Sequence, residues 1–324
     1  MDRLLFILSI SFGSIAAGYI TRRVTGSRTR GFEKAIPSIS RFLKLLAFFF
    51  LNPVAVVSTF WGASLPDGRV LALPLLGLGS VFAGMLAAYT AIKLMRIPPE
   101  RAGSVFACGA FGNVLTIGGL IAYTFFREPG YFLVQLTNLT MYPAYFLLGY
   151  PISANIGLDR KPVFRLSLAS FKENPFLVLP LAATAVGISI RLSGIPRPDI
   201  LAGVVAFVVP ISAAVLGFSI GLTLRFTRVK SYLGEITAVI VIRHLLLPLL
   251  MIPAAILLGF GNISDGLPLK ITIILSCMPV AFSALVPAAI YGFDLDLANS
   301  AWMVSTGLLA VTVPLLFVVF HLIL

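Results

Sequence analysis

Residues 102–126 read AGSVFACGAFGNVLTIGGLIAYTFF, and residues 269–291 read LKITIILSCMPVAFSALVPAAIY. Each run is long and apolar enough for a helix that crosses the hydrocarbon core of a membrane, which takes about 20 residues. Each is also interrupted by residues that a helix tolerates poorly, glycine in the first run and proline in the second. Because freed backbone groups are costly in hydrocarbon, we expect two broken membrane helices whose interruptions are satisfied by other parts of the protein.

Eight further apolar runs accompany these two. Hydrophobic residues make up 59% of the 324 residues and charged residues only 11%, against about 25% charged residues in a soluble domain. Clusters of Gly, Pro and charged residues separate the runs and predict short turns. The fold class is therefore an all-α polytopic membrane protein with ten transmembrane helices. The predicted helices lie at about 4–20, 42–61, 70–94, 102–126, 131–151, 175–192, 200–222, 236–259, 269–291 and 298–322.

The formal net charge of +12 is spread over the short segments between apolar runs. It lies on no single helix face, so we expect no nucleic-acid partner and interpret the charge as a topology signal. Eighteen of the 24 Lys and Arg residues lie in or beside the odd-numbered loops. This bias predicts a multi-pass protein of the cell membrane, with those loops in the cytoplasm and both termini outside. The longest basic segment, 21–41, is expected to be a loop that contacts anionic lipid of the bilayer.

Matching features recur in the same order in the two halves of the chain. Pro53 in the second run and Pro210 in the seventh are each followed nine positions later by a small residue. Five helices per half is an odd number, so the second half must enter the membrane from the opposite side. We expect two inverted five-helix repeats, 1–152 and 174–324, joined by a cytoplasmic loop, 153–173.

Broken helices at matching places of two inverted halves are the best sequence indication of a transport site. The amino ends of such half-helices present free amides and a partial positive charge, which suits an anion. Asn113, at the first break, can bind a carboxylate or an ion without a charge penalty, or can bond another helix. The other candidate substrate-binding residues are Thr116, Gly118, Gln135, Asn138, Pro279, Ser283 and Pro287. The alternative is that both runs are ordinary kinked packing helices and that Gln135 and Asn138 only join helices.

Charged residues are nearly absent from the predicted membrane interior. None of the twelve Asp and Glu residues lies in the middle of a run, so a proton relay through an embedded carboxylate has no candidate. Arg243 and His244 are the nearest ionisable groups. Arg243 either has a coupling or charge role or snorkels to the cytoplasmic face. Asn52 either satisfies the backbone beside Pro53 or takes part in coupling. We expect no cofactor and no metal site, although Na⁺ held by carbonyls, hydroxyls and amides stays open.

Gly217-Phe218-Ser219-Ile220-Gly221 matches the G-x-S-x-G motif of hydrolase nucleophiles, which requires a strand, a sharp turn and a helix. Here the residues lie inside an apolar helical run. The same residues form G-x-x-x-G, which lets two helices approach closely in lipid. The sequence also lacks a Walker loop, an H-E-x-x-H motif and a cysteine zinc pattern. We therefore expect helix packing here and a protein that is not an enzyme.

Short motifs over nearly the whole chain resemble the auxin efflux carrier family, whose wider group includes the bile acid–sodium symporters. They are Asn52-Pro53, Gly112-Asn113, Glu173-Asn174-Pro175-Phe176, Arg243 to Pro248, Met278-Pro279-Val280-Ala281 through Tyr291-Gly292, Thr306 and Pro314. The resemblance implies a scaffold of helices 1, 2, 6 and 7, a mobile transport unit of helices 3–5 and 8–10, and a crossing of helices 4 and 9 at the site. It also implies an anionic substrate, such as an auxin, malate or malonate, and a homodimer through the scaffold. Where plant carriers have a proline at the first crossover, this chain has Gly118-Gly119, so its break is softer or shifted toward Asn113.

The expected function is a secondary transporter that moves a small organic anion by an elevator-like, alternating-access motion. Two alternatives stay open: a sodium-coupled symporter of a bile-acid-like anion, and a membrane receptor or sensor without turnover. A membrane enzyme would need a carboxylate pair or a histidine cluster at the membrane face, and the sequence offers neither.

Overall fold

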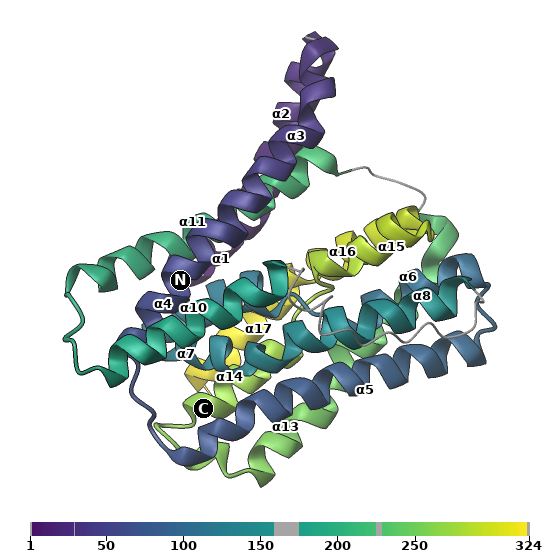
Figure 1. Cartoon of the computed structure of the whole chain (residues 1–324). Helices are drawn as coiled ribbons and strands as arrows, with labels where there is room; N and C mark the ends of the chain where they lie inside the picture. The colour runs from purple at the N-terminus through teal and green to yellow at the C-terminus, as the bar shows by residue number, and fades with distance from the viewer. Residues whose placement is uncertain (1, 29, 159–174, 225–228, 323–324) are drawn as a thin grey trace. The chain divides into compact units, whose positions relative to one another are not determined.

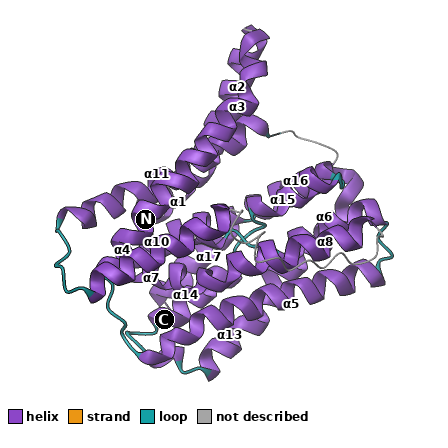
Figure 2. Cartoon of the chain, in the orientation of Figure 1, coloured by secondary structure: helices purple, strands orange, loops and turns teal. Residues whose placement is uncertain are grey.

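The computed structural model describes residues 2–28, 30–158, 175–224 and 229–322, and nearly all of them are helical (Figures 1 and 2). Six helices of this part are long and apolar enough to cross a membrane: Asp2–Gly26, Gly31–Gly62, Gly68–Leu94, Ile200–Thr223, Val229–Leu257 and Leu295–His321. Three shorter apolar helices are Val178–Leu192, Leu267–Ser276 and Phe282–Tyr291. The fold is that of a helical, multi-pass membrane protein, whereas ten spans in two inverted repeats stay a prediction.

The chain divides into two compact units. Unit 1 comprises Met1–Ser64, Leu115–Gln135 and Val178–Arg225, and unit 2 comprises Leu65–Val114, Leu136–Leu177 and Phe226–Leu324. The division passes through α7 (Gly119–Ala144), between Gln135 and Leu136. α7 itself consists of two helices, because Arg127 inside it has a non-helical backbone with φ 55° and ψ −147°.

Unit 1 is built from long helices that contain single π-turns. Its elements are α1 (Asp2–Leu8), η1 (Ser9–Gly13), α2 (Ser14–Arg28), α3 (Arg30–Leu46), η2 (Ala47–Leu51), α4 (Asn52–Gly62), most of η4 (Val114–Gly118), the first part of α7, most of α10 (Pro175–Leu192) and α11 (Ile200–Thr223). Val205, Val208 and Val209 of α11 form its buried core with Ala55 of α4 and with Tyr123 and Tyr131 of α7.

Apart from Thr29, which lies outside the described residues, the basic segment 21–41 is helical, so the prediction of a loop there is wrong. The first part of the segment continues α2, the second part belongs to α3, and Figure 1 shows the two helix ends side by side. A Cβ on Gly26 would lie 3.2 Å from Cγ of Glu33, so the two ends are in contact. The reason for the error is that Ile36, Ile39 and Leu43 repeat at the spacing of one helix face, and this period outweighs the charged composition.

The G-x-x-x-G motif of α11 packs against α2, as predicted. A Cβ on Gly221 would overlap the carbonyl of Ile15 and lie 2.9 Å from the Tyr19 amide nitrogen, so only glycine lets the two backbones approach this closely. Ser219 does not act as a nucleophile elbow would. Its Oγ lies 2.9 Å from Oγ of Ser40 in α3, and it donates to the Ser40 carbonyl at 3.0 Å.

We expect Gly221→Val to separate α2 from α11 and to lower the thermal denaturation midpoint of the purified protein. The added side chain meets backbone of α2, which cannot rotate away, and overpacking of this kind costs about 1–3 kcal/mol. Gly203→Ala is the matched control, because a Cβ at that position of α11 meets no atom within 4 Å. It should leave the midpoint unchanged or raise it slightly. Equal midpoints for the two variants would contradict the close approach.

Unit 2 contains the interrupted helices. Its elements are η3 (Gly68–Ala72), α5 (Leu73–Leu94), α6 (Pro99–Ala110), the end of α7, η5 (Tyr145–Gly149), α8 (Tyr150–Leu158), η6 (Val229–Tyr232), α12 (Leu233–Val241), η7 (Ile242–Leu246), α13 (Leu247–Leu257), η8 (Phe260–Asn262), α14 (Leu267–Ser276), η9 (Phe282–Ala284), α15 (Leu285–Tyr291), α16 (Leu295–Gly307) and α17 (Leu309–Leu322). The predicted connecting loop 153–173 is corrected in its first part, because residues 153–158 continue α8. Residues 159–174, which include Glu173 and Asn174 of the family-like motif, lie outside the described residues.

A polar cluster joins the first turns of α6, α12 and α16. Arg101 of α6 pairs with Glu235 of α12 at 3.0 Å and lies 3.8 Å from a carboxylate oxygen of Asp294, the residue before α16. The Tyr232 hydroxyl donates to Oδ1 of Asp294 at 3.2 Å. The same Oδ1 accepts the Leu297 amide at 2.9 Å and so caps the amino end of α16. One carboxylate therefore holds three helix starts together.

Candidate functional site

Two helices of unit 2 end and continue as non-helical chain. α6 ends at Ala110 and is followed by residues 111–113, and α14 ends at Ser276 and is followed by residues 277–281. The first interruption therefore lies at Asn113 rather than at Gly118, which is helical.

The second interruption surrounds Pro279. Pro287, the later proline of this run and a predicted site residue, does not interrupt a helix, because it lies in the first turn of α15. A helix accepts proline in its first turn, where the amide has no partner within the helix anyway.

The two interruptions bond to each other. Gly112 and Val280 form an antiparallel bridge. The flanking hydrogen bonds, each 2.8 Å long, run from the Asn113 amide to the Pro279 carbonyl and from the Ala281 amide to the Phe111 carbonyl. Each broken segment thus provides hydrogen-bond partners for backbone groups of the other. These bonds offset the free-energy cost of unpaired backbone groups inside a membrane.

Two side chains satisfy the remaining amides of the bridge. The Gly112 amide donates to the hydroxyl of Tyr145 at 3.1 Å, and the Val280 amide donates to Oγ of Ser305 at 3.2 Å. Both side chains are buried. They come from η5 and α16, far from the breaks in the chain, and sequence reasoning did not identify either residue as part of the site.

Arg243 brings a positive charge to the same place. Its Nε and Nη2 donate to the Met278 carbonyl at 3.2 and 2.8 Å, and its side chain is 2% exposed. Nη2 lies against Gly112, because a Cβ at that glycine would overlap it. Arg243 therefore contacts both interruptions and does not snorkel to a membrane surface. Within the described ranges no carboxylate oxygen lies within 4 Å of its guanidinium.

A π-turn places this arginine. In η7 the Leu247 amide bonds to the Ile242 carbonyl, five residues back. Pro248, next in the chain, has no amide to give to the His244 carbonyl four residues back, which favours a widened turn. The extra residue shifts the register of the helix at Arg243, so its inward direction could not be read from a regular helical period.

Aromatic side chains line one side of the bridge. The Phe111 ring packs on Tyr145 with centroids 4.5 Å apart and on Tyr150 with centroids 5.6 Å apart. The Tyr150 hydroxyl donates to the Ser283 carbonyl at 2.8 Å. Tyr142 and Phe146 extend this cluster along the same helix face. The spacing of these aromatic residues at three, four and eight positions was the signal in the sequence that could have revealed them.

Some of the predicted site residues of unit 2 lie in or next to the bridge, and others lie on helices around it. Asn113 and Pro279 lie in the bridge, and Ser283 follows it in η9. Asn138 lies buried on α7, where its Oδ1 has no hydrogen-bond partner among the described residues. His244 lies beside Arg243, and its Nε2 likewise lacks a partner in this part of the chain.

The remaining predicted residues belong to unit 1. Thr116 and Gly118 lie in η4, and Gln135 is a buried residue of α7 whose Nε2 has no hydrogen-bond partner within the described ranges. Oδ1 of Asn52 accepts a 2.6 Å hydrogen bond from Ser212 of α11. Asn52 thus joins α4 to α11, and a coupling role for it stays a prediction.

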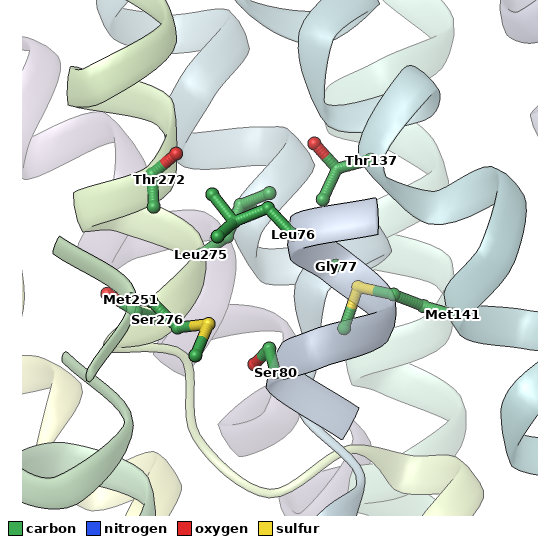
Figure 3. Close-up of a pocket in the computed structure, with 9 residues that line it drawn as sticks. All are labelled: Leu76, Gly77, Ser80, Thr137, Met141, Met251, Thr272, Leu275 and Ser276. Atoms are coloured by element: carbon green, nitrogen blue, oxygen red, sulfur yellow. The ribbon is translucent and has the colours of Figure 1, made fainter. Parts of the chain in front are cut away.

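A small cavity beside α14 does not fit an organic substrate. Figure 3 shows it between side chains of α5, α7, α13 and α14. Its volume of about 20 Å³ admits a single water molecule. It is lined by Leu76, Gly77, Ser80, Thr137, Met141, Met251, Thr272, Leu275 and Ser276.

Unit 1 contains a larger cavity, of about 310 Å³. Pockets of this size hold small organic ligands. The charged residues around it are Arg3 and Arg127, opposed by Asp2, and its other lining residues are Phe6, Tyr123, Thr124, Ala206 and Pro210. Two guanidinium groups against one carboxylate make its surroundings net positive.

Comparison with known proteins supports a role in membrane transport. The chain is 28% identical over 226 residues to an uncharacterized transporter of Methanothermobacter thermautotrophicus, and the match covers 62% of this chain and 73% of that protein. No family model matches the chain. With the apolar helices, this similarity supports a role in membrane transport and favours transport over catalysis. The likeness to auxin efflux carriers stays a prediction.

Proposed function

We propose that this chain is a secondary transporter that moves a small organic anion by alternating access. The observation that carries the proposal is the bridge between two interrupted helices, with a buried arginine against it. Non-helical backbone at membrane depth is tolerated where it is buried in protein or lines a polar path. Interrupted helices of this kind form the substrate sites of many secondary transporters.

The charges around the bridge favour an anion. Arg243 has no carboxylate within 4 Å among the described residues to neutralise it. Asn113 adds an amide side chain at the bridge, and helical turns begin again at Val114 and Phe282. The amino ends of these turns carry partial positive charge. The net positive surroundings of the larger cavity in unit 1 fit the same substrate class.

The division of the chain supports the proposed moving parts. Unit 1 contains the first, second, sixth and seventh apolar runs, and unit 2 contains the third, eighth, ninth and tenth. In the proposal unit 1 is the scaffold, through which two copies form a dimer, and unit 2 is the transport unit that carries the site. Ten spans in two inverted repeats, with helices 4 and 9 crossing at the bridge and both termini outside the cytoplasm, belong to the same proposal.

The test of this function is uptake by proteoliposomes. A panel of labelled mono- and dicarboxylates, including auxin, malate and malonate, is offered with and without sodium and proton gradients. We expect uptake of at least one carboxylate above that of empty liposomes. Uptake that requires sodium would favour the alternative of a sodium-coupled symporter, saturable binding without uptake would favour a receptor, and neither binding nor uptake would overturn the proposal.

Asn113→Ala tests the position of the site. A hydrogen bond to a charged group contributes about 1.5–3 kcal/mol, so we expect uptake at low substrate concentration to fall about tenfold or more. The backbone bond from Asn113 to Pro279 does not need the side chain, so the bridge should still form in the variant, and the thermal midpoint measured beside uptake checks this. Asn262→Ala, at an exposed asparagine of η8 in the same unit, is the matched control. Unchanged uptake by Asn113→Ala would remove this residue from the site.

A further inference from the structure

Two helices of unit 2 end with their carboxyl ends at the bridge. α6 has 12 residues and α14 has 10, and each runs into its interruption at its carboxyl end. The last carbonyls of a helix lack partners within the helix and carry about half an elementary negative charge. Two such ends therefore place about one negative charge beside the bridge, away from water.

The guanidinium of Arg243 supplies the opposite charge at that place. It holds the Met278 carbonyl, two residues beyond the end of α14, with two hydrogen bonds of 3.2 and 2.8 Å. Its Nη2 also lies against Gly112, two residues beyond the end of α6. A single positive charge thus touches the chain just after both helix ends.

The pairing is otherwise hard to explain. An arginine whose side chain is 2% exposed and has no carboxylate partner in the described part of the chain is costly to bury. The carbonyl dipoles of the two helix ends are a partner that compensates this cost, while the amino ends of the turns that begin at Val114 and Phe282 keep the bridge favourable for an anion. Conversely, two helix carboxyl ends buried together without Arg243 would attract a cation from solution, because carbonyl oxygens are good ligands for small cations.

We infer that Arg243 is a built-in cation that takes the place of an exchangeable coupling ion at the bridge. The inference rests on the proposed function only for its transport consequence. Because the positive charge is part of the chain, substrate binding at the bridge does not depend on Na⁺. Unit 2 keeps this charge whether or not sodium is present. Removing the guanidinium while keeping the rest of the chain exposes the site to cations from solution.

The test measures the thermal denaturation midpoint of the purified protein in detergent. Unfolding is monitored by the fluorescence of Trp61 and Trp302. The wild type should have the same midpoint in sodium, potassium and choline chloride. Arg243→Ala should melt roughly 4–8 °C lower, and 10 mM guanidinium chloride, far below denaturing concentration, should restore at least half of the loss. Urea at 10 mM has nearly the same shape without the charge and should restore nothing.

Two further variants keep the test informative if Arg243→Ala fails to fold. Arg243→Lys retains the charge and should stay within about 3 °C of the wild type. Arg243→Met fills similar space without charge and should lose stability as the alanine variant does. Wild-type stability that rises with sodium, equal rescue by urea and guanidinium, or an Arg243→Met variant as stable as the wild type would each overturn the inference.

These readouts separate the inference from the proposed function. If no carboxylate is taken up but guanidinium rescues the midpoint, the transport proposal fails and the built-in cation stands. If a carboxylate is taken up only with sodium, the built-in cation fails and transport stands. Uptake that is equal in sodium and choline media, together with rescue, supports both.

Discussion

Gly112→Ala is expected to abolish uptake and to destabilise unit 2 by about 3 kcal/mol. The added methyl group would overlap Nη2 of Arg243 and lie 2.7 Å from Cζ of its guanidinium. A long side chain usually yields to such a contact at little cost. This one is buried and bonded twice to the Met278 carbonyl, so moving it leaves a buried charge and a buried carbonyl without partners, and losses of about 3–5 kcal/mol follow from such changes.

The matched control for this prediction is Gly79→Ala. Gly79 lies in α5 of the same unit, and a Cβ there meets no atom within 4 Å. The control should keep wild-type uptake and a wild-type thermal midpoint, measured in the same proteoliposome and detergent preparations. A second comparison is the double variant Gly112→Ala with Arg243→Lys, because lysine lacks the Nη2 atom that is overlapped. It should recover part of the midpoint lost in Gly112→Ala. Full activity of Gly112→Ala would show that the guanidinium is not confined by the bridge.

Local backbone chemistry made the interruptions predictable. Gly112 and Pro279 disfavour a continuing helix, and both lie inside the two interruptions of unit 2, just after α6 ends at Ala110 and α14 ends at Ser276. The same reasoning failed for Pro287, because a proline early in a helix and a proline that ends one look alike until the start of the helix is known. The first break falls at Asn113 because the glycines at 118 and 119 are tolerated within helical turns.

The partners of the bridge could not be predicted, since they depend on contacts between distant segments. Tyr145 and Ser305 are unremarkable residues of apolar runs, and only their positions beside Gly112 and Val280 give them a role. Arg243 was visible as a charge, but its direction was open. The π-turn before Pro248 decides it, and a regular period of 3.6 residues does not describe such a turn.

The error in segment 21–41 has the opposite cause. Its basic composition matched that of a cytoplasmic loop, and composition was given more weight than periodicity. Ile36, Ile39 and Leu43 of α3 repeat at helical spacing, and this local pattern proved the better guide. The basic composition of the segment did not predict its secondary structure.

Asp294→Ala is expected to lower the stability of unit 2 by about 2–3 kcal/mol. The substitution removes the cap of α16, where a cap contributes about 1 kcal/mol, and the acceptor of the Tyr232 hydroxyl, whose loss costs a similar amount. The pairing with Arg101 at 3.8 Å involves a partly exposed arginine, so its contribution is the smallest. A denaturation midpoint measured in detergent should fall by several degrees.

Asp294→Asn is the variant that separates these contributions. Asparagine caps helices as well as aspartate does and can accept the Tyr232 hydroxyl, so only the charge toward Arg101 is lost, and the midpoint should fall by less than half as much. Because α16 also supplies Ser305 to the Val280 amide, loosening its first turn should lower uptake in Asp294→Ala and leave it nearly unchanged in Asp294→Asn. Equal losses in the two variants would mean that the ion pair, rather than the cap and the tyrosine, holds the three helix starts together.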